Sequence, residues 1–303
     1  MNGILAILSA LIFAPLLPGV INKTKAFFSG KKGPSIFQLY YDILKLIRKG
    51  AVYSTTTTFL FKTGPVISLA AMIIVLFLLP LGGQPSILFF PGDYVVLIYF
   101  LGLVRFFMIL AALDTGSSFE GMGASREAAF STLCEPVLFV SLAALCKMTG
   151  QTSLTGVFSG IDSWIFGNHI PVILLILTAI YIIYLAENAR IPVDDPNTHL
   201  ELTMIHEVMI LDHSGPDLAF LLYSGSLKLW IFGSVLSGIL AAAIPLSPLT
   251  HFAFCIGWLI LIGVLTGITE SVMARLKLIH IPQLLIAAFS FSVLGILILL
   301  EEL

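Results

Sequence analysis

The chain has 303 residues, of which 58% are hydrophobic and only 11% charged, with a formal net charge of −2. A soluble domain of this length carries about 25% charged residues, so this composition excludes a soluble enzyme and indicates a polytopic membrane protein. The three cysteines include no Cys-x-x-Cys pair. We therefore expect no disulfide framework, metal site or cofactor held by this chain alone, and no nucleic-acid partner.

A membrane-spanning helix requires about 20 mostly apolar residues, and eight stretches come close to this requirement. We therefore predict an all-α fold, a polytopic membrane helix bundle that forms a single integral membrane domain over residues 1–303. The expected spans are 3–21, 65–81, 94–113, 129–147, 170–186, 229–246, 252–269 and 281–300.

Lysine and arginine are concentrated in the connections at one end of these spans. All of the 15 basic residues except Arg105 and Lys147 lie there. Positively charged loops remain in the cytoplasm, so we expect a multi-pass protein of the cell's inner membrane with both termini outside. The corresponding cytoplasmic loops are 22–64, 114–128, 187–228 and 270–280.

Within the first of these loops, residues 35–49 are predicted to form an amphipathic helix on the membrane surface. Apolar residues recur on one face, and polar residues form the opposite stripe. This helix either only anchors the loop or provides a docking surface for a cytoplasmic subunit. The candidate docking residues are Lys32, Gly33, Pro34, Gln38, Asp42 and Lys45.

The connection before the fourth span begins a series of acids that continues into the membrane. Asp114, Glu120 and Glu127 lie in the connection, and Glu135 lies about two helical turns inside the span. Arg105, inside the third span, is the obvious partner for Glu135. The pair either neutralises itself or forms part of a proton path, because intramembrane ionisable residues commonly mark such paths.

The segment from Leu185 to Gly215 holds the densest group of titratable residues. Acids beside a low-dielectric region have raised pKa values, so their protonation responds to nearby charge. The alternative is that individual acids are solvated or ion-paired. The candidate proton-path residues are Asp114, Glu120, Glu127, Glu135, Glu187, Asp194, Glu201, Glu207 and Asp212, with Arg105, Arg126 and Arg190 as charge partners.

No metal site is predicted in this segment. His206 and Glu207 begin like a HExxH motif, but the next histidine is His213, seven positions after His206. Two histidines must lie four apart to meet one metal ion on one helical face. The sequence also contains no nucleophile-elbow, P-loop or dinucleotide-binding motif, so catalysis by the chain alone is not predicted.

Two motifs resemble the complex I subunit 1 family, which includes the quinone-site membrane subunit of NADH-quinone oxidoreductases. They are Gly33-Pro34 with the following Gln-x-x-x-Asp-x-x-Lys-Leu helix, and the AExxRxPxDxP pattern that begins at Ala186. The stretch from Leu113 to Ala128, with Glu135-Pro136 after it, resembles the group 4 [NiFe]-hydrogenase branch of this family. The positions that depart from the family pattern are Val193, Asn197, His199 and His213.

The resemblance implies a non-catalytic subunit of an oxidoreductase complex of the formate hydrogenlyase or hydrogenase-4 kind. Such a subunit anchors the hydrogenase large and small subunits to the bilayer and couples electron transport to proton translocation beside antiporter-like membrane subunits. The NiFe and 4Fe–4S centres are then expected in the partner subunits. Two alternatives stay open: the quinone-site subunit of an NADH-quinone oxidoreductase, and a standalone cation transporter, which would need paired discontinuous helices.

Overall fold

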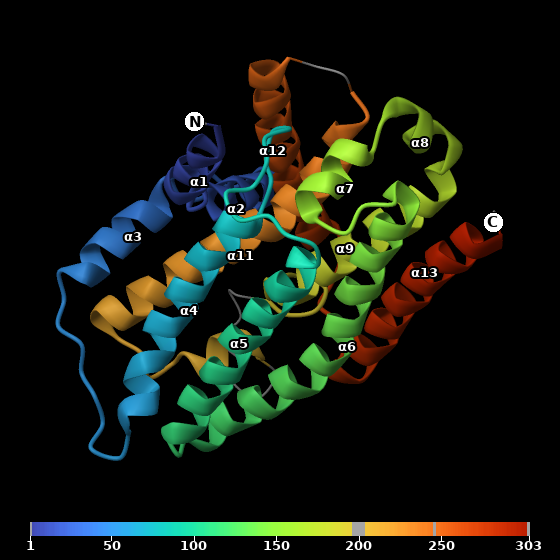
Figure 1. Cartoon of the computed structure of the whole chain (residues 1–303). Coiled ribbons are helices and arrows are strands. Elements are labelled where there is room, and N and C mark those ends of the chain that lie inside the picture. The colour runs from blue at the N-terminus through green and yellow to red at the C-terminus, as the bar shows by residue number, and fades with distance from the viewer. Residues whose placement is uncertain (1, 196–203, 245–246, 302–303) are drawn as a thin grey trace.

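The computed structural model describes residues 2–195, 204–244 and 247–301. These residues form a helical bundle in which the only β pairing is a single bridge between Leu81 and Gln84, so the all-α fold is confirmed (Figure 1). The helices are α1 (Asn2–Phe13), α2 (Leu16–Phe28), α3 (Gln38–Ile47), α4 (Phe59–Leu78), α5 (Asp93–Asp114), α6 (Ser118–Thr149), α7 (Leu154–Gly160), α8 (Ser163–Asn168), α9 (Ile170–Glu187), α10 (His206–Met209), α11 (Gly215–Ala242), α12 (Pro248–Val272), the 3-10 helix η1 (Leu278–His280) and α13 (Ile281–Glu301).

Within the described ranges, 7 segments are long and apolar enough to cross a membrane, and α1 with α2 makes an eighth candidate. The pair is bent by 48°, and the bend falls at Pro15, which caps α2. Proline lacks the backbone N–H that would continue the helix. The expected first span, 3–21, is therefore two helices, and the second continues to Phe28.

Three helices begin inside stretches that the sequence suggested as loops. They are α4 at Phe59, α6 at Ser118 and α11 at Gly215. Their first turns carry polar residues, and Thr58 caps α4 by accepting a hydrogen bond from the Leu60 amide. Hydropathy locates the apolar part of a helix, so it places these starts too late. The difference matters because the early turns carry several of the candidate site residues.

The helix at the centre of the bundle is α11. Its apolar window is 83% buried, whereas the other spanning helices are buried over 28–44% of theirs. It packs against α3, α4, α9 and α12, and close packing of this kind requires small residues. A Cβ atom added to Gly233 would lie 2.8 Å from Leu259 Cδ2, and one added to Gly238 would lie 3.2 Å from Phe158 Cε2.

The predicted interfacial helix is present as α3 and lies against α2 and α11. Two of its faces are apolar rather than one. Leu39 and Ile43 turn toward the bundle and are half-buried, whereas Tyr41 and Leu44 are exposed. The hydroxyl of Tyr40 donates to the backbone carbonyl of Ile12, which ties α3 to the end of α1.

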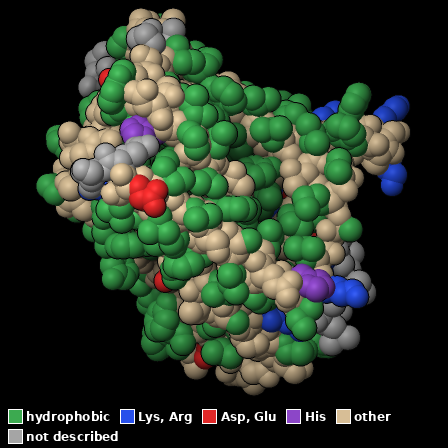
Figure 2. Space-filling model, turned by 90° about the vertical axis from the view of Figure 1, so that its right-hand side faces the viewer, with side chains coloured by type: hydrophobic (Ala, Val, Ile, Leu, Met, Phe, Trp, Pro, Cys, Tyr) green, Lys and Arg blue, Asp and Glu red, His purple; other side chains and the backbone are tan. Residues whose placement is uncertain are grey.

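Both termini lie toward the end of the bundle that also carries α7 and α8 (Figure 1). The other end, where α2, α5, α9 and α12 finish and α4, α6 and α13 begin, carries most of the lysine and arginine. We call it the basic end. Figure 2 shows that hydrophobic side chains cover most of the visible face, with Lys and Arg gathered at its right margin. This distribution fits a bundle surrounded by lipid.

Candidate functional site

Glu187, the last residue of α9, is held between two cations from other helices. Arg105 Nη1 of α5 lies 3.0 Å from Glu187 Oε1, and Lys228 Nζ of α11 lies 2.8 Å from Oε2. The second nitrogen of Arg105, Nη2, lies 2.9 Å from Glu135 Oε1 of α6. The pair of Arg105 and Glu135 that the sequence suggested is therefore present, within a network of two cations and two carboxylates that we call the charge network.

Burial explains why the charges of this network occur together. Only 4% of the Glu187 side chain, 7% of Arg105 and 11% of Lys228 are exposed. Removing an ion from water costs several kcal/mol unless a partner of opposite charge offsets it. Glu135 differs from the other three, because 45% of its side chain is exposed on the outer surface of the bundle. The charge network thus runs from the interior to that surface.

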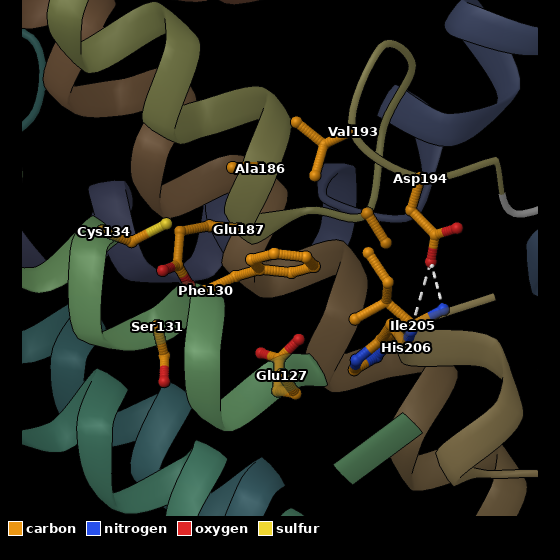
Figure 3. A pocket seen from close by; sticks show the side chains of 11 residues that line it. Glu127, Phe130, Ser131, Cys134, Ala186, Glu187, Val193, Asp194, Ile205 and His206 are labelled. Carbon is orange, nitrogen blue, oxygen red and sulfur yellow. Dashed lines mark hydrogen bonds between the residues drawn. The ribbon is translucent and has the colours of Figure 1, made fainter. Parts of the chain in front are cut away.

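Two small cavities lie next to the charge network. The first, shown in Figure 3, has about 20 Å³ of space and is lined by Glu127, Glu187, Asp194 and His206. The second has about 30 Å³ and is lined by Arg105, Glu127, His206 and Lys228 among others. A water molecule needs roughly 10–15 Å³ of such space and several polar partners. Each cavity therefore has room for water beside ionisable groups.

A larger cavity of about 360 Å³ opens at the basic end between α2, α3, α10 and α11. Glu187, His206 and Lys228 line this cavity as well as one or both of the small ones, so the three spaces share walls. Asp42 of α3 and Glu207 of α10 also line it. Polar side chains and water-sized spaces therefore connect the basic end to the charge network.

Two neighbouring residues of α10 have shifted pKa values in opposite directions. Burial, together with the negative charge of Asp194, raises the pKa of Glu207 to about 7. Burial, followed by the positive charge of Lys228, lowers the pKa of His206 to about 4. At neutral pH, Glu207 is therefore close to half-protonated and His206 is neutral. Glu207 is therefore suited to exchanging protons with water in the cavity, whereas His206 offers a neutral imidazole that can donate and accept hydrogen bonds.

Asp194 organises the connection between α9 and α10. Its Oδ2 accepts hydrogen bonds from the amides of Ile205, at 3.0 Å, and His206, at 3.1 Å, which Figure 3 shows as dashed lines. Its Oδ1 lies 2.8 Å from Arg275 Nη2. The side chain is 1% exposed. Asp194 therefore positions the His206 segment, and its oxygens are occupied in doing so.

A second group of ion pairs meets at Glu270, near the end of α12. Arg190 Nη1 lies 3.5 Å from Glu270 Oε1, and Lys25 Nζ lies 2.8 Å from Oε2. These contacts join the segment that follows α9 to α2 and α12. Arg126 of α6 contacts another part of the connection between α9 and α10, because it donates to the carbonyl of Met204 at 2.8 Å.

Of the other predicted acids, Asp114 and Glu120 accept hydrogen bonds from backbone amides, and Asp212 is exposed. Asp114 accepts from the Thr58 amide at 2.6 Å and from the Phe61 amide at 3.3 Å, so it caps α4. Glu120 is buried and accepts from the amide of Asp212 at 3.1 Å, while Asp212 itself is exposed. None of these three acids lines the cavities beside the charge network. Glu201 lies outside the described residues.

The candidate docking residues lie on α3 and on the connection between α2 and α3. Gln38 Nε2 donates to Asp42 Oδ1 at 3.0 Å, and the carbonyl of Lys32 accepts from Lys23 Nζ at 2.8 Å. Gly33 has a φ of 64°, in the left-handed region that favours glycine. The exposed residues of this set are Lys32, Gly33, Pro34, Gln38 and Lys45.

Lys228 and Arg275 were missed as site residues, because their positions suggested only the general positive charge of the basic end. Lys228 had a usable signal, since it stands alone between the apolar runs of α11, and an ionisable residue inside a spanning helix is a candidate functional group. No comparable signal marks Arg275. Its pairing with Asp194 joins positions 81 residues apart in the chain.

His213 is buried and stacks on Phe61, with ring centroids 4.0 Å apart. Desolvation lowers its pKa to about 4. Across residues 2–195, 204–244 and 247–301, no group of three His, Cys, Asp or Glu side chains is arranged to hold a metal ion. His199 lies outside these ranges.

A bundle of spanning helices with a largely buried network of ion pairs defines a polytopic all-α membrane protein. The family model described as NADH dehydrogenase matches residues 2–300. The chain belongs to this family, which confirms the resemblance of its motifs to complex I subunit 1.

Two relatives, both from Escherichia coli strain K12, match nearly the whole chain. Formate hydrogenlyase subunit 4 is 29% identical over 95% of this chain and 94% of its own length. Hydrogenase-4 component C is 30% identical over 94% of this chain and 91% of its own length. The structure is similar to a chain of the membrane-bound sulfane sulfur reductase, an archaeal respiratory membrane complex, with a TM-score of 0.80 and 20% identity over 97% of this chain and 98% of that one.

Proposed function

We propose that this chain is the membrane-anchoring, proton-coupling subunit of a membrane-bound hydrogenase complex of the formate hydrogenlyase or hydrogenase-4 kind. In this role it docks the peripheral hydrogenase subunits at its basic end and links their redox events to ion translocation. The lengthwise similarity to formate hydrogenlyase subunit 4 and hydrogenase-4 component C supports this assignment. The concentration of lysine and arginine supports a cytoplasmic basic end and outer termini.

The observation that carries the proposal is the charge network between the cavity at the basic end and the outer surface of the bundle. Glu207 is the group of α10 whose pKa lets it exchange protons near neutral pH, and the neutral imidazole of His206 lines the same cavity. Water in the small cavities beside Glu127 and Glu187 continues the route. Glu135, which the shared cation Arg105 holds near Glu187, then receives the proton at the outer surface.

Arg105 and Lys228 hold the carboxylates of this route in place. A guanidinium retains its proton at any physiological pH, so Arg105 positions both carboxylates without carrying the proton itself. A charge change in a docked subunit alters the protonation of Glu207 through the Coulomb interaction. Electron transfer in the partner is thereby coupled to proton movement in this chain.

The redox centres themselves belong to the docked subunits in this proposal. A 4Fe–4S cluster takes four cysteine thiolates, and the chain has three cysteines. Cys134 and Cys255 are buried in α6 and α12, so neither is exposed to a docked subunit. The contribution of this chain is to bind the partners and to hold or move protons.

Proton uptake by the reconstituted complex tests the proposal. Purification through a tag on this chain is expected to recover nickel, iron and the hydrogenase subunits. In liposomes containing a pH-sensitive dye, Glu135→Gln is expected to reduce hydrogenase-coupled proton movement at least tenfold, while hydrogen turnover with a soluble electron donor stays at the parent rate. Asp212→Asn, which alters an exposed acid, is the matched control. Parent-like proton movement by Glu135→Gln would reject the relay.

A quinone-site subunit is the second candidate, and the cavity of about 360 Å³ favours it. Small-molecule sites commonly have volumes of about 300–1,000 Å³. The lining is rich in charged groups, however, which suits water better than an apolar quinone ring. Recovery of a flavin-containing NADH module and bound quinone with the tagged chain would support this candidate and oppose the hydrogenase assignment.

A further inference from the structure

A separate cavity of about 340 Å³ lies at the end of the bundle opposite the basic end. Its walls come from the connection after α4, from α7, from the end of α11 and from the start of α12, which lie toward the same end of the molecule in Figure 1. No residue of the charge network lines this cavity. Any chemistry that it supports is therefore distinct from the proposed relay.

Two side chains in the wall of this cavity are of the kinds that bind soft metal ions. His251 and Cys255 lie four positions apart on α12, and Cys255 Sγ is 3.7 Å from His251 Nδ1. Two ligands of one tetrahedral ion, with metal–sulfur and metal–nitrogen bonds of roughly 2.3 and 2.1 Å, lie about 3.6 Å apart. One ion can therefore reach both atoms without a change in the helix.

The other nitrogen of the His251 ring fixes its tautomer. Nε2 lies 3.2 Å from the backbone carbonyl oxygen of Ala241. A carbonyl oxygen only accepts hydrogen bonds, so Nε2 carries the proton and Nδ1 of the neutral ring presents a lone pair. Metal-binding histidines usually donate their second N–H to an acceptor of this kind, which orients the ring. His251 thus already has the tautomer that binds a metal through Nδ1.

A glycine leaves Nδ1 open to the cavity. Gly83, in the connection after α4, has a φ of 69°, in the left-handed region. A Cβ atom added there would lie 3.2 Å from His251 Nδ1. Cys255 is 0% exposed, so an ion reaches the pair from the side of the half-buried His251 ring. The cavity also has room for water to complete the coordination.

Charge and the number of ligands select the class of ion. The pair supplies two ligands, and no group of three His, Cys, Asp or Glu in the described part of the chain could hold a metal. Structural zinc takes four ligands, and calcium and magnesium prefer oxygen. A divalent ion on one thiolate keeps a net positive charge, which is costly beside apolar walls such as Phe158 and Ile244. Monovalent Cu(I), which thiolates prefer, forms a neutral unit with one thiolate.

We propose that His251 and Cys255 form a binding site for one Cu(I) ion, coordinated through Nδ1 and the thiolate sulfur. The Cys255 thiol loses its proton to water as the copper–sulfur bond forms, and the copper stays in the same oxidation state. The site goes beyond the proposed function and does not depend on the proton relay.

A Cu(I) titration of the purified complex without oxygen, against a colorimetric Cu(I) chelator, tests this proposal. Cys255→Ala is expected to hold one Cu(I) ion fewer than the parent. His251→Gln is expected to bind that ion at least tenfold more weakly, because loss of even an indirect partner of a metal ligand commonly costs that much. Cys146→Ala, at the half-buried thiol of α6, is the matched control and should bind like the parent.

X-ray absorption at the copper edge identifies the ligands in complexes loaded with one equivalent. The parent should show one sulfur and at least one nitrogen ligand, and His251→Gln should lose the imidazole signal. This spectrum carries the test by itself if Cys255→Ala fails to assemble. Parent-like Cu(I) binding by Cys255→Ala, or an unchanged spectrum in His251→Gln, would overturn the site. Retention of Zn(II) in preference to Cu(I) would overturn the choice of ion.

Discussion

Arg105 and Lys228 contact opposite oxygens of one carboxylate. Arg105 Nη1 lies 3.0 Å from Oε1 of Glu187, and Lys228 Nζ lies 2.8 Å from Oε2. The two cations come from α5 and α11 and meet at the end of α9. Because both cations share Glu187, we expect replacing Glu187 to destabilise the folded chain more than replacing Lys228.

Glu187→Gln leaves two buried cations without the carboxylate between them. Breaking a buried ion pair in this way destabilises a protein by about 3–5 kcal/mol, so we expect low recovery and an early thermal transition in detergent. Lys228→Met should be milder, because Arg105 still pairs with Glu187. The double variant should be more stable than Glu187→Gln alone, since one uncompensated cation is removed. Additive losses would contradict the shared-carboxylate arrangement.

Glu207 is expected to titrate near pH 7. Its pKa in the folded chain, about 7, is above the ordinary value of 4.5. The folded state therefore binds this proton more tightly than the unfolded state. The resulting contribution to stability is present below pH 4.5 and is lost as the pH rises from 4.5 to about 7.

Infrared difference spectroscopy of the purified complex measures this titration directly. A protonated-carboxyl band should disappear with a midpoint near pH 7 and should be absent from Glu207→Gln. Asp212→Asn, at an exposed acid, should leave the band unchanged. A band that persists in Glu207→Gln would assign the titration to another acid.

Asp114 is expected to contribute to folding rather than to proton transfer. It caps α4 through the amides of Thr58 and Phe61, and removal of a helix cap costs about 0.5–2 kcal/mol. Asp114→Ala should therefore lower the thermal transition modestly while each assembled complex moves protons at the parent rate. Loss of proton movement in fully assembled complexes would show that Asp114 takes part in proton transfer.

Arg190 is expected to position the segment after α9 for docking. Arg190→Ala removes the contact with Glu270 at 3.5 Å, but Lys25 still pairs with that carboxylate at 2.8 Å. The chain should therefore fold, while recovery of the peripheral subunits through a tag on it falls several-fold. Lys25→Gln removes the other partner of Glu270 and is the matched control. Equal recovery from both variants would exclude a docking role for Arg190.

Much of the architecture was predictable because a bilayer admits few solutions. Runs of apolar residues specify the spanning helices, and the spacing in residues 35–49 indicated the amphipathic α3. The polar helix starts escaped prediction. Gly215 and Ser118 begin helices inside expected loops, since hydropathy cannot distinguish a polar loop from polar helical turns that other helices cover.

Part of the candidate site was likewise predictable from the sequence, and part was not. The intramembrane positions of Arg105 and Glu135 indicated their pairing, which the structure contains at 2.9 Å. The motif beginning at Ala186 also marked Glu187 as important. The sequence alone could not separate Asp114, which caps a helix, from Glu207, which lines a cavity. Both are acids near the basic end.

The sequence by itself determined the membrane bundle, its basic end and the family, because hydropathy, charge and local motifs are properties of neighbouring residues. Only the tertiary structure decided which charges meet. Lys228 and Glu187 are 41 positions apart, and Arg275 and Asp194 are 81 apart, yet each pair is in direct contact. Burial and the reach of a partner charge depend on how helices pack, and no local pattern encodes them.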